Sequence, residues 1–127
     1  MGTQQLLLIV VATIIVGAAI VVGFKVFGAN AVLANRDSIS AELNNLAAVA
    51  MQYYKKPKEI GGGSNSFTNW QIPSQLDSTA YGTYTASPTS QVLTITGVGT
   101  EIGNDGSTNV RLVATITQSD ISMLIQN

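Results

Sequence analysis

Residues 6–24 read LLLIVVATIIVGAAIVVGF, and this run determines how the rest of the chain must be organised. It contains no charged side chain, and Thr13 carries its only hydroxyl group. As an α-helix the run would extend about 28 Å, close to the roughly 30 Å hydrocarbon core of a bilayer. Lys25 follows at once, as a charge often does at the membrane interface. The run therefore predicts a helix that is surrounded by lipid or by other apolar helices.

A cleavable secretory signal and a simple membrane anchor are the two competing interpretations of this run. A secretory signal needs a positively charged start and a shorter apolar region. Residues 1–5, MGTQQ, carry no positive side chain. A single-pass anchor agrees with the composition equally well, so that alternative stays open.

Small residues recur inside the run at a spacing of four. Thr13 and Gly17 form one such pair, and Ala19 and Gly23 form another. This spacing lets helix backbones approach closely, although glycine and alanine are common in membrane helices in general. We predict that the helix packs against other copies of the chain. The predicted contact residues are Gln5, Leu6, Leu7, Ile9, Val10, Thr13, Ile14, Gly17, Ala18, Val21, Gly23 and Phe24.

An amphipathic helix is expected over residues 28–56. No glycine or proline lies between Gly28 and Pro57, and apolar residues recur at helical spacing. The helix should end near residues 54–56, before Pro57. A break near Asn35 is an alternative, because Asp37 and Ser38 could start a second helix. The apolar stripe consists of Val32, Ile39, Leu43, Leu46, Ala50 and Tyr53.

The remaining residues predict a loop followed by an antiparallel sheet. Residues 57–78 are rich in glycine and polar side chains, with Phe67, Trp70 and Ile72 as expected anchors. Apolar and polar residues alternate in the runs 91–98 and 110–117, which indicates strands. The run 79–86 is a further candidate strand, because β-branched and aromatic residues dominate from Thr79 onward. Residues 103–106, GNDG, are a strong hairpin signal. Residues 121–125 could be an edge strand or a terminal turn.

We therefore predict an α+β fold, in which a sheet of three or four strands covers the apolar stripe. A sheet with one apolar face and a helix with one apolar stripe complete each other. The sheet would use Leu93, Ile95, Leu112 and Ile116 for this contact. The expected division is an apolar half-helix at 1–27, projecting with nothing in its own chain to cover it, and a globular domain at 28–127. Within that domain the helix should occupy 28–56, the loop 57–78 and the sheet 79–127.

The composition excludes several classes of function. Charged residues make up only 10% of the chain, against about 25% in an ordinary soluble domain. The net charge of −1 gives no electrostatic case for nucleic-acid binding. Lys55, Lys56 and Lys58 are better explained as cations at a helix C-terminus. The chain has no cysteine and no histidine, which removes disulfides, thiolate metal sites and the commonest general base.

No motif in the sequence predicts an enzyme, a metal site or a cofactor site. The acidic residues form no close pair in the sequence, and no nucleophile, zinc-protease or phosphate-loop motif is present. Asp105 lies in a turn that loosely resembles a calcium loop. That turn lacks the spacing of acidic ligands, so a hairpin is the better interpretation.

The layout of the chain resembles that of the bacterial type IV pilins. Members of that family have an apolar half-helix, an amphipathic half-helix, a connecting loop and an antiparallel sheet. The resemblance covers the whole chain in layout but is specific in sequence only in the N-terminal half. It implies that Met1 is the first mature residue, exposed by a prepilin peptidase and methylated on its amine.

Three features depart from the family pattern. Pilins usually have Glu at position five, where this chain has Gln5. They often have proline near position 22, where the helix loosens in the filament, whereas this chain has Val22 beside Gly23. The resemblance therefore implies that any loosening of this helix falls around Gly17 and Gly23. The disulfide loop near the C-terminus is also missing. These departures indicate a divergent pilin, and they keep a pseudopilin or an archaeal-type filament protein as alternatives.

The resemblance implies a structural subunit of an extracellular pilus that serves adhesion, surface motility or DNA uptake. Its partners would be other copies of the same chain, the inner membrane before assembly, and the pilus assembly machinery. A pseudopilin of a type II-like secretion system is one alternative function. A membrane-anchored binding module is another.

Overall fold

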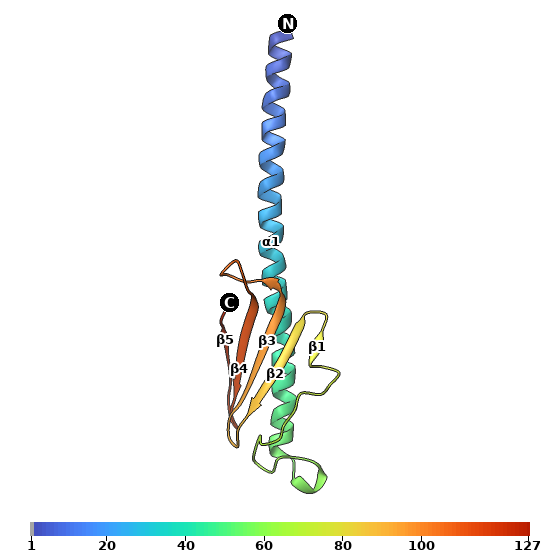
Figure 1. Ribbon diagram of the computed structural model, residues 1–127, viewed down its shortest axis with the longest axis vertical. Coiled ribbons are helices and arrows are strands. Elements are labelled where there is room, and N and C mark those ends of the chain that lie inside the picture. Colours follow the sequence, from blue (N-terminus) through green and yellow to red (C-terminus); the bar gives the residue numbers. More distant parts are fainter. Residues whose placement is uncertain (1) are drawn as a thin grey trace. The chain divides into compact units, whose positions relative to one another are not determined.

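The computed structural model describes residues 2–127, which divide into two compact units, Met1–Ala31 and Val32–Asn127. Helix α1 (Gly2–Lys55) is followed by the short 3-10 helix η1 (Lys58–Ile60). Five strands come next (Figure 1). They are β1 (Ser78–Thr79), β2 (Gly82–Pro88), β3 (Leu93–Ile102), β4 (Asn109–Ile116) and β5 (Ile121–Ile125). The chain therefore has the α+β fold that the sequence predicted.

Helix α1 is continuous from Gly2 to Lys55, so no second helix starts at Asp37 or Ser38. The helix ends at Lys55, which agrees with the predicted end near residues 54–56, before Pro57. Gly17 and Gly23 lie within regular helix. The loosening that we predict at these two glycines concerns the assembled filament and stays a prediction.

The sheet is antiparallel throughout, in the order β1-β2-β3-β4-β5. It has one strand more than the upper number expected. Residues 121–125 pair along β4 as a true edge strand. The run 79–86 is also divided, because the chain reverses at residues 80–81 and pairs Thr79 with Gly82. The backbone N–H of Tyr81 donates to the Thr79 hydroxyl at 3.2 Å within this reversal.

The core of the second unit forms where the sheet meets α1, as the alternation predicted. Leu93, Ile95, Leu112 and Ile116 are buried on the inner face of the sheet. The opposing helix residues are Ile39, Leu43, Leu46, Ala47 and Ala50, which are buried in the same cluster. Burying a side chain of this size stabilises the fold by about 1.5–3 kcal/mol. The cluster therefore supplies most of the unit's stability.

Tyr54 closes one end of this core, whereas the predicted stripe residue Tyr53 is only half-buried. The Tyr54 ring lies 4.7 Å from that of Phe67, centroid to centroid. Its hydroxyl lies 2.9 Å from Gln91 Oε1 and 3.0 Å from Gln118 Oε1. Phe67 and Trp70 are buried and Ile72 packs against the cluster, which confirms the three predicted loop anchors.

Two of the three glycines after η1, Gly62 and Gly63, allow close packing at the end of α1. A Cβ on Gly62 would lie 2.1 Å from the Lys56 carbonyl oxygen, and one on Gly63 would lie 1.9 Å from that of Ser66. The Gly63 N–H donates to Tyr53 O at 2.7 Å, and the Ser64 N–H donates to Lys56 O at 2.9 Å. The loop thereby satisfies carbonyl groups that a helix end leaves without partners.

Asn35 is the buried polar residue that joins α1 to the sheet, and it is only 7% exposed. Its side-chain amide donates to the Tyr81 carbonyl oxygen at 2.9 Å and to Thr100 Oγ1 at 3.4 Å. Its side-chain oxygen accepts from the backbone N–H groups of Thr100 and Glu101, at 3.2 and 3.4 Å. A buried amide with all of these partners fixes one register of helix against sheet.

The contact with Asn35 coincides with an irregularity in β3. The pairing of β3 with β4 shifts register between Val98 and Ile102. Gly99 is required there, because a Cβ would lie 2.0 Å from the Asn35 side-chain oxygen. The bulge therefore directs the backbone N–H groups of Thr100 and Glu101 toward Asn35 on α1 and not toward β4.

Replacing Asn35 by alanine should lower the free energy of unfolding by about 1–3 kcal/mol, because buried backbone groups lose their partners. The measurement is denaturant unfolding in detergent, followed by the fluorescence of Trp70, the single tryptophan. Asn44→Ala is the matched control, since Asn44 is exposed on the same helix. Equal stability of the two variants would contradict the account of Asn35.

Candidate functional site

The surface of the N-terminal unit is almost entirely apolar and exposed. Large apolar side chains from Leu6 to Phe27 are between 44% and 75% exposed. The helix is long and apolar enough to cross a membrane, by length and composition, and none of its most apolar stretch is buried in the described chain. Soluble monomers rarely expose an apolar patch of more than a few hundred Å². This surface is therefore the main candidate for a functional contact.

All twelve predicted contact residues lie on α1 and are exposed, from Gln5 to Phe24. Whether they contact other copies of the chain stays a prediction. The expected processing and methylation site, Met1, lies outside the described residues.

The polar groups inside the apolar run are satisfied within the helix itself. The Thr13 hydroxyl donates to the Ile9 carbonyl oxygen at 2.9 Å. Backbone groups in a helix bond to one another, which is the condition for a segment that enters lipid or a dry bundle. Within residues 6–24 this helix therefore offers only apolar contact.

A shallow apolar groove follows the small residues along this helix. Seven residues line it: Ala18, Ala19, Val22, Gly23, Val26, Phe27 and Asn30. The predicted contact set includes Ala18 and Gly23 but none of the other five groove residues. The signal was present, because the spacing of four that joins Ala19 to Gly23 continues to Phe27. The groove therefore extends beyond the predicted contact set, past Lys25.

Nothing within the described chain explains the glycines of this helix. A Cβ added at Gly17, Gly23 or Gly28 would meet no atom within 4 Å. Glycine inside a helix costs about 1 kcal/mol relative to alanine. In Gly62, Gly63 and the sheet glycine Gly99, by contrast, a Cβ would collide with the chain itself. Because no contact within the described chain requires glycine at these helical positions, they point to the close approach of another molecule.

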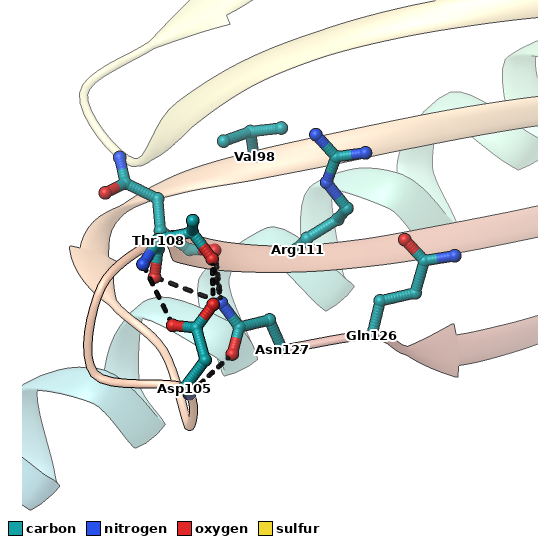
Figure 2. Close-up of a pocket in the computed structure, with 7 residues that line it drawn as sticks. Val98, Asp105, Thr108, Arg111, Gln126 and Asn127 are labelled. Atoms are coloured by element: carbon teal, nitrogen blue, oxygen red, sulfur yellow. Dashed lines mark hydrogen bonds between the residues drawn. The ribbon is translucent and has the colours of Figure 1, made fainter.

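The hairpin between β3 and β4 forms the main polar cluster of the second unit (Figure 2). The Asp105 carboxylate accepts from the backbone N–H groups of Ser107 and Thr108, both at 2.9 Å, and from the Thr108 hydroxyl. These bonds hold the pKa of Asp105 well below its usual range. Gly106 adopts a positive φ of 73°, which completes the turn predicted from the GNDG run.

Asn127 fastens this hairpin to the end of the described chain. Its side-chain amide donates to Thr108 Oγ1 at 2.7 Å and to the Asn109 carbonyl oxygen at 3.0 Å. Its side-chain oxygen accepts from the Asp105 N–H at 3.0 Å. Figure 2 shows these groups gathered around the turn, with Arg111 turned away from the Asp105 carboxylate. The arrangement closes a turn, and its carboxylate oxygens are occupied by donors of the hairpin.

Glu42 forms a second polar cluster, between α1 and the first strands. Its carboxylate accepts hydrogen bonds from the Thr79 hydroxyl, at 2.9 Å, and from the Tyr84 hydroxyl. Burial is the main reason that the pKa of Tyr84 is raised above its ordinary value. The hydrogen bond to Glu42 and the negative charge of Glu42 act in the same direction. The cluster thus ties the helix to the sheet and uses the Glu42 carboxylate as an acceptor.

These clusters have structural explanations, and neither offers a combination of groups suited to catalysis. Within residues 2–127, no group of three or more Asp, Glu, His or Cys side chains is placed to hold a metal ion. Comparisons with protein-family models, with curated proteins and with solved structures gave no match to the chain. The exposed apolar surface of the N-terminal helix therefore remains the main candidate for a functional contact.

The protonated form of Tyr84 should persist to higher pH than an ordinary tyrosine, whose pKa is about 10. The associated stability is complete below that value and is lost as the pH rises through the higher pKa of the folded state. We expect a late phase in the tyrosinate absorbance titration of the folded chain. Tyr84→Phe should remove that phase, and a late phase that survives the substitution would contradict the assignment.

Proposed function

We propose that this chain is the structural subunit of a type IV pilus filament and polymerises through its N-terminal helix. The observation that carries the proposal is the exposure of the apolar side chains from Leu6 to Phe27. Water solvates such a surface poorly, at a cost of about 25 cal/mol for every Å² of apolar area. Lipid or a bundle of identical helices removes this cost.

A helical bundle explains two features that a simple anchor does not. The first is the presence of Gly17 and Gly23, for which the chain itself gives no reason. The second is the groove along Ala19, Gly23 and Phe27, where a second helix could approach closely. One surface that packs against a different surface of the next copy generates an open helical fibre whenever the rotation between copies does not close a ring.

The second unit is suited to face solvent in such a fibre. It has its own core between α1 and the sheet. The outward-facing residues of β2, Thr83, Thr85 and Ser87, carry hydroxyl groups and are exposed. We therefore expect the sheet domains to form the outside of an extracellular filament and the apolar helices to form its centre. Before assembly, the same helix would hold the subunit in the inner membrane, until the assembly machinery extracts it.

Gln5 requires a different arrangement at the start of the helix from that of most pilins. A glutamine amide accepts a hydrogen bond but cannot neutralise the charge of an α-amino group. An unpaired ammonium in an apolar bundle is costly.

The proposal is tested by shearing the source cells and examining the released material by electron microscopy, with the subunit identified by mass. We expect long, thin filaments that contain this chain. If the chain instead stays in the membrane fraction as a detergent-soluble monomer, the proposal is wrong and a membrane-anchored module is favoured. Short fibres that remain in the periplasm would favour a pseudopilin.

Replacing Gly17 and Gly23 by leucine should reduce the yield of filaments without lowering insertion into the membrane. Leucine is apolar enough for lipid, but its side chain would keep neighbouring backbones apart. The measurement is the filament fraction after shearing, compared with the membrane fraction of the same cells. Leu8→Ile is the control, because it changes the apolar surface without filling the groove. Normal yield from the double leucine variant would contradict close packing at these sites.

A further inference from the structure

Lys25 is the one charged side chain in residues 2–31 of this chain. It lies beside the groove residues Val22 and Val26 on the same helix. At a membrane surface its ammonium group would face water and lipid phosphates. Inside a bundle of apolar helices it would be surrounded by apolar side chains, where an unpaired charge is strongly disfavoured.

No acidic side chain of residues 2–31 can neutralise Lys25, because all seven acids of the chain lie after residue 36. The first of them is Asp37. Twelve residues of helix correspond to about 18 Å, so the ammonium group cannot reach Asp37 of its own chain. Inside a bundle, a carboxylate that neutralises Lys25 would therefore belong to another molecule.

Asp37 is the carboxylate best placed for this role. It is exposed on α1, and within residues 2–127 no hydrogen bond to its carboxylate is found. Its sequence neighbour Arg36 is directed elsewhere, since it donates to the Asn127 carbonyl oxygen at 3.3 Å and to Asn104 Oδ1 at 2.7 Å. The charge of Asp37 is thus available to a neighbouring molecule.

The other acids are less suitable partners. The Glu42 carboxylate is half-buried and bonded to Thr79 and Tyr84. That of Asp105 accepts three hydrogen bonds within its own hairpin. Glu59 lies in η1, beyond the end of α1, and the remaining acids, Asp77, Glu101 and Asp120, also lie outside α1. Asp37 combines exposure with a position on the helix that carries Lys25.

We infer that Lys25 of one copy pairs with Asp37 of a neighbouring copy in the assembled filament. The inference rests on the proposed function and names the polar contact that fixes the stagger between adjacent helices. For parallel helices the pair requires a relative shift of about 18 Å along the axis. An ion pair in apolar surroundings stabilises only the arrangement in which both charges meet. Apolar packing alone would allow several staggers, so this pair would select one.

The test is a charge exchange in the full chain, with filaments counted by electron microscopy after shearing. Lys25→Glu and Asp37→Lys should each reduce filament yield at least about tenfold, because each places like charges together. The double variant, K25E with D37K, should recover most of the yield. Lys25→Arg and Glu59→Lys are matched controls and should assemble as the unchanged chain does.

A second measurement reports proximity directly. The chain has no cysteine, so an introduced pair is the sole source of disulfides. Mixed filaments of Lys25→Cys and Asp37→Cys chains should yield a cross-linked dimer on mild oxidation, because a disulfide needs Cα atoms within about 7 Å. A mixture of Lys25→Cys with Glu59→Cys should not.

Three outcomes would overturn the inference. Single variants that assemble normally would show that the pair is not needed, and a double variant no better than the singles would show that these two residues are not partners. Loss of the Lys25→Glu chain from the membrane before assembly would show that Lys25 acts on lipid headgroups. Failure of the unchanged chain to form filaments is a separate result, which would remove the proposed function and this inference with it.

Discussion

The rest of this structure depends on one constraint, which is that residues 6–24 carry a large apolar surface that the described chain does not bury. Hydrophobic burial is the dominant favourable contribution to folding and association, so a surface of this kind requires a partner. The apolar run offers no free polar side chain to a partner, since its only hydroxyl group, that of Thr13, donates to the Ile9 carbonyl oxygen. Only lipid or other apolar helices can therefore serve as that partner. In the proposal of a pilus subunit, lipid covers this surface before assembly and other apolar helices cover it in the filament.

In the second unit, by contrast, the buried polar groups find hydrogen-bond partners within the chain itself. Asn35 places its amide among four partners on the helix-facing side of the sheet. The Tyr54 hydroxyl reaches two glutamine side chains, and the loop after η1 covers the last carbonyl groups of α1. The core of this unit is built entirely from residues after Ala31 and uses no residue of the apolar run. The second unit thus contains the folded core, and the N-terminal unit carries the surface for which we propose association.

Periodicity made the core of the second unit predictable, because residues that alternate in a strand or recur along a helix must share a face. Leu93, Ile95 and Leu112 were assigned to the inner face for this reason, and the structure confirms them. The bulge at Gly99 was not predictable, since it depends on where Asn35 meets the sheet in three dimensions. The two-residue strand β1 was missed because its turn carries no strong sequence signal. The predicted contact set includes only part of the groove on the N-terminal helix, because the small residues end at Gly23 and the spacing of four continues with the large residue Phe27.

The most direct test of the account measures whether the N-terminal helices lie next to one another in the assembled state. A spin label on Ala18→Cys would report this by electron paramagnetic resonance, because the chain contains no other cysteine. Packed helices lie about 8–10 Å apart, axis to axis. We therefore expect strong spin–spin broadening on assembly, which dilution with unlabelled chain should remove, and little broadening from a label on Ser119→Cys. An Ala18 label whose spectrum stays that of an isolated spin in assembled material would contradict the central claim.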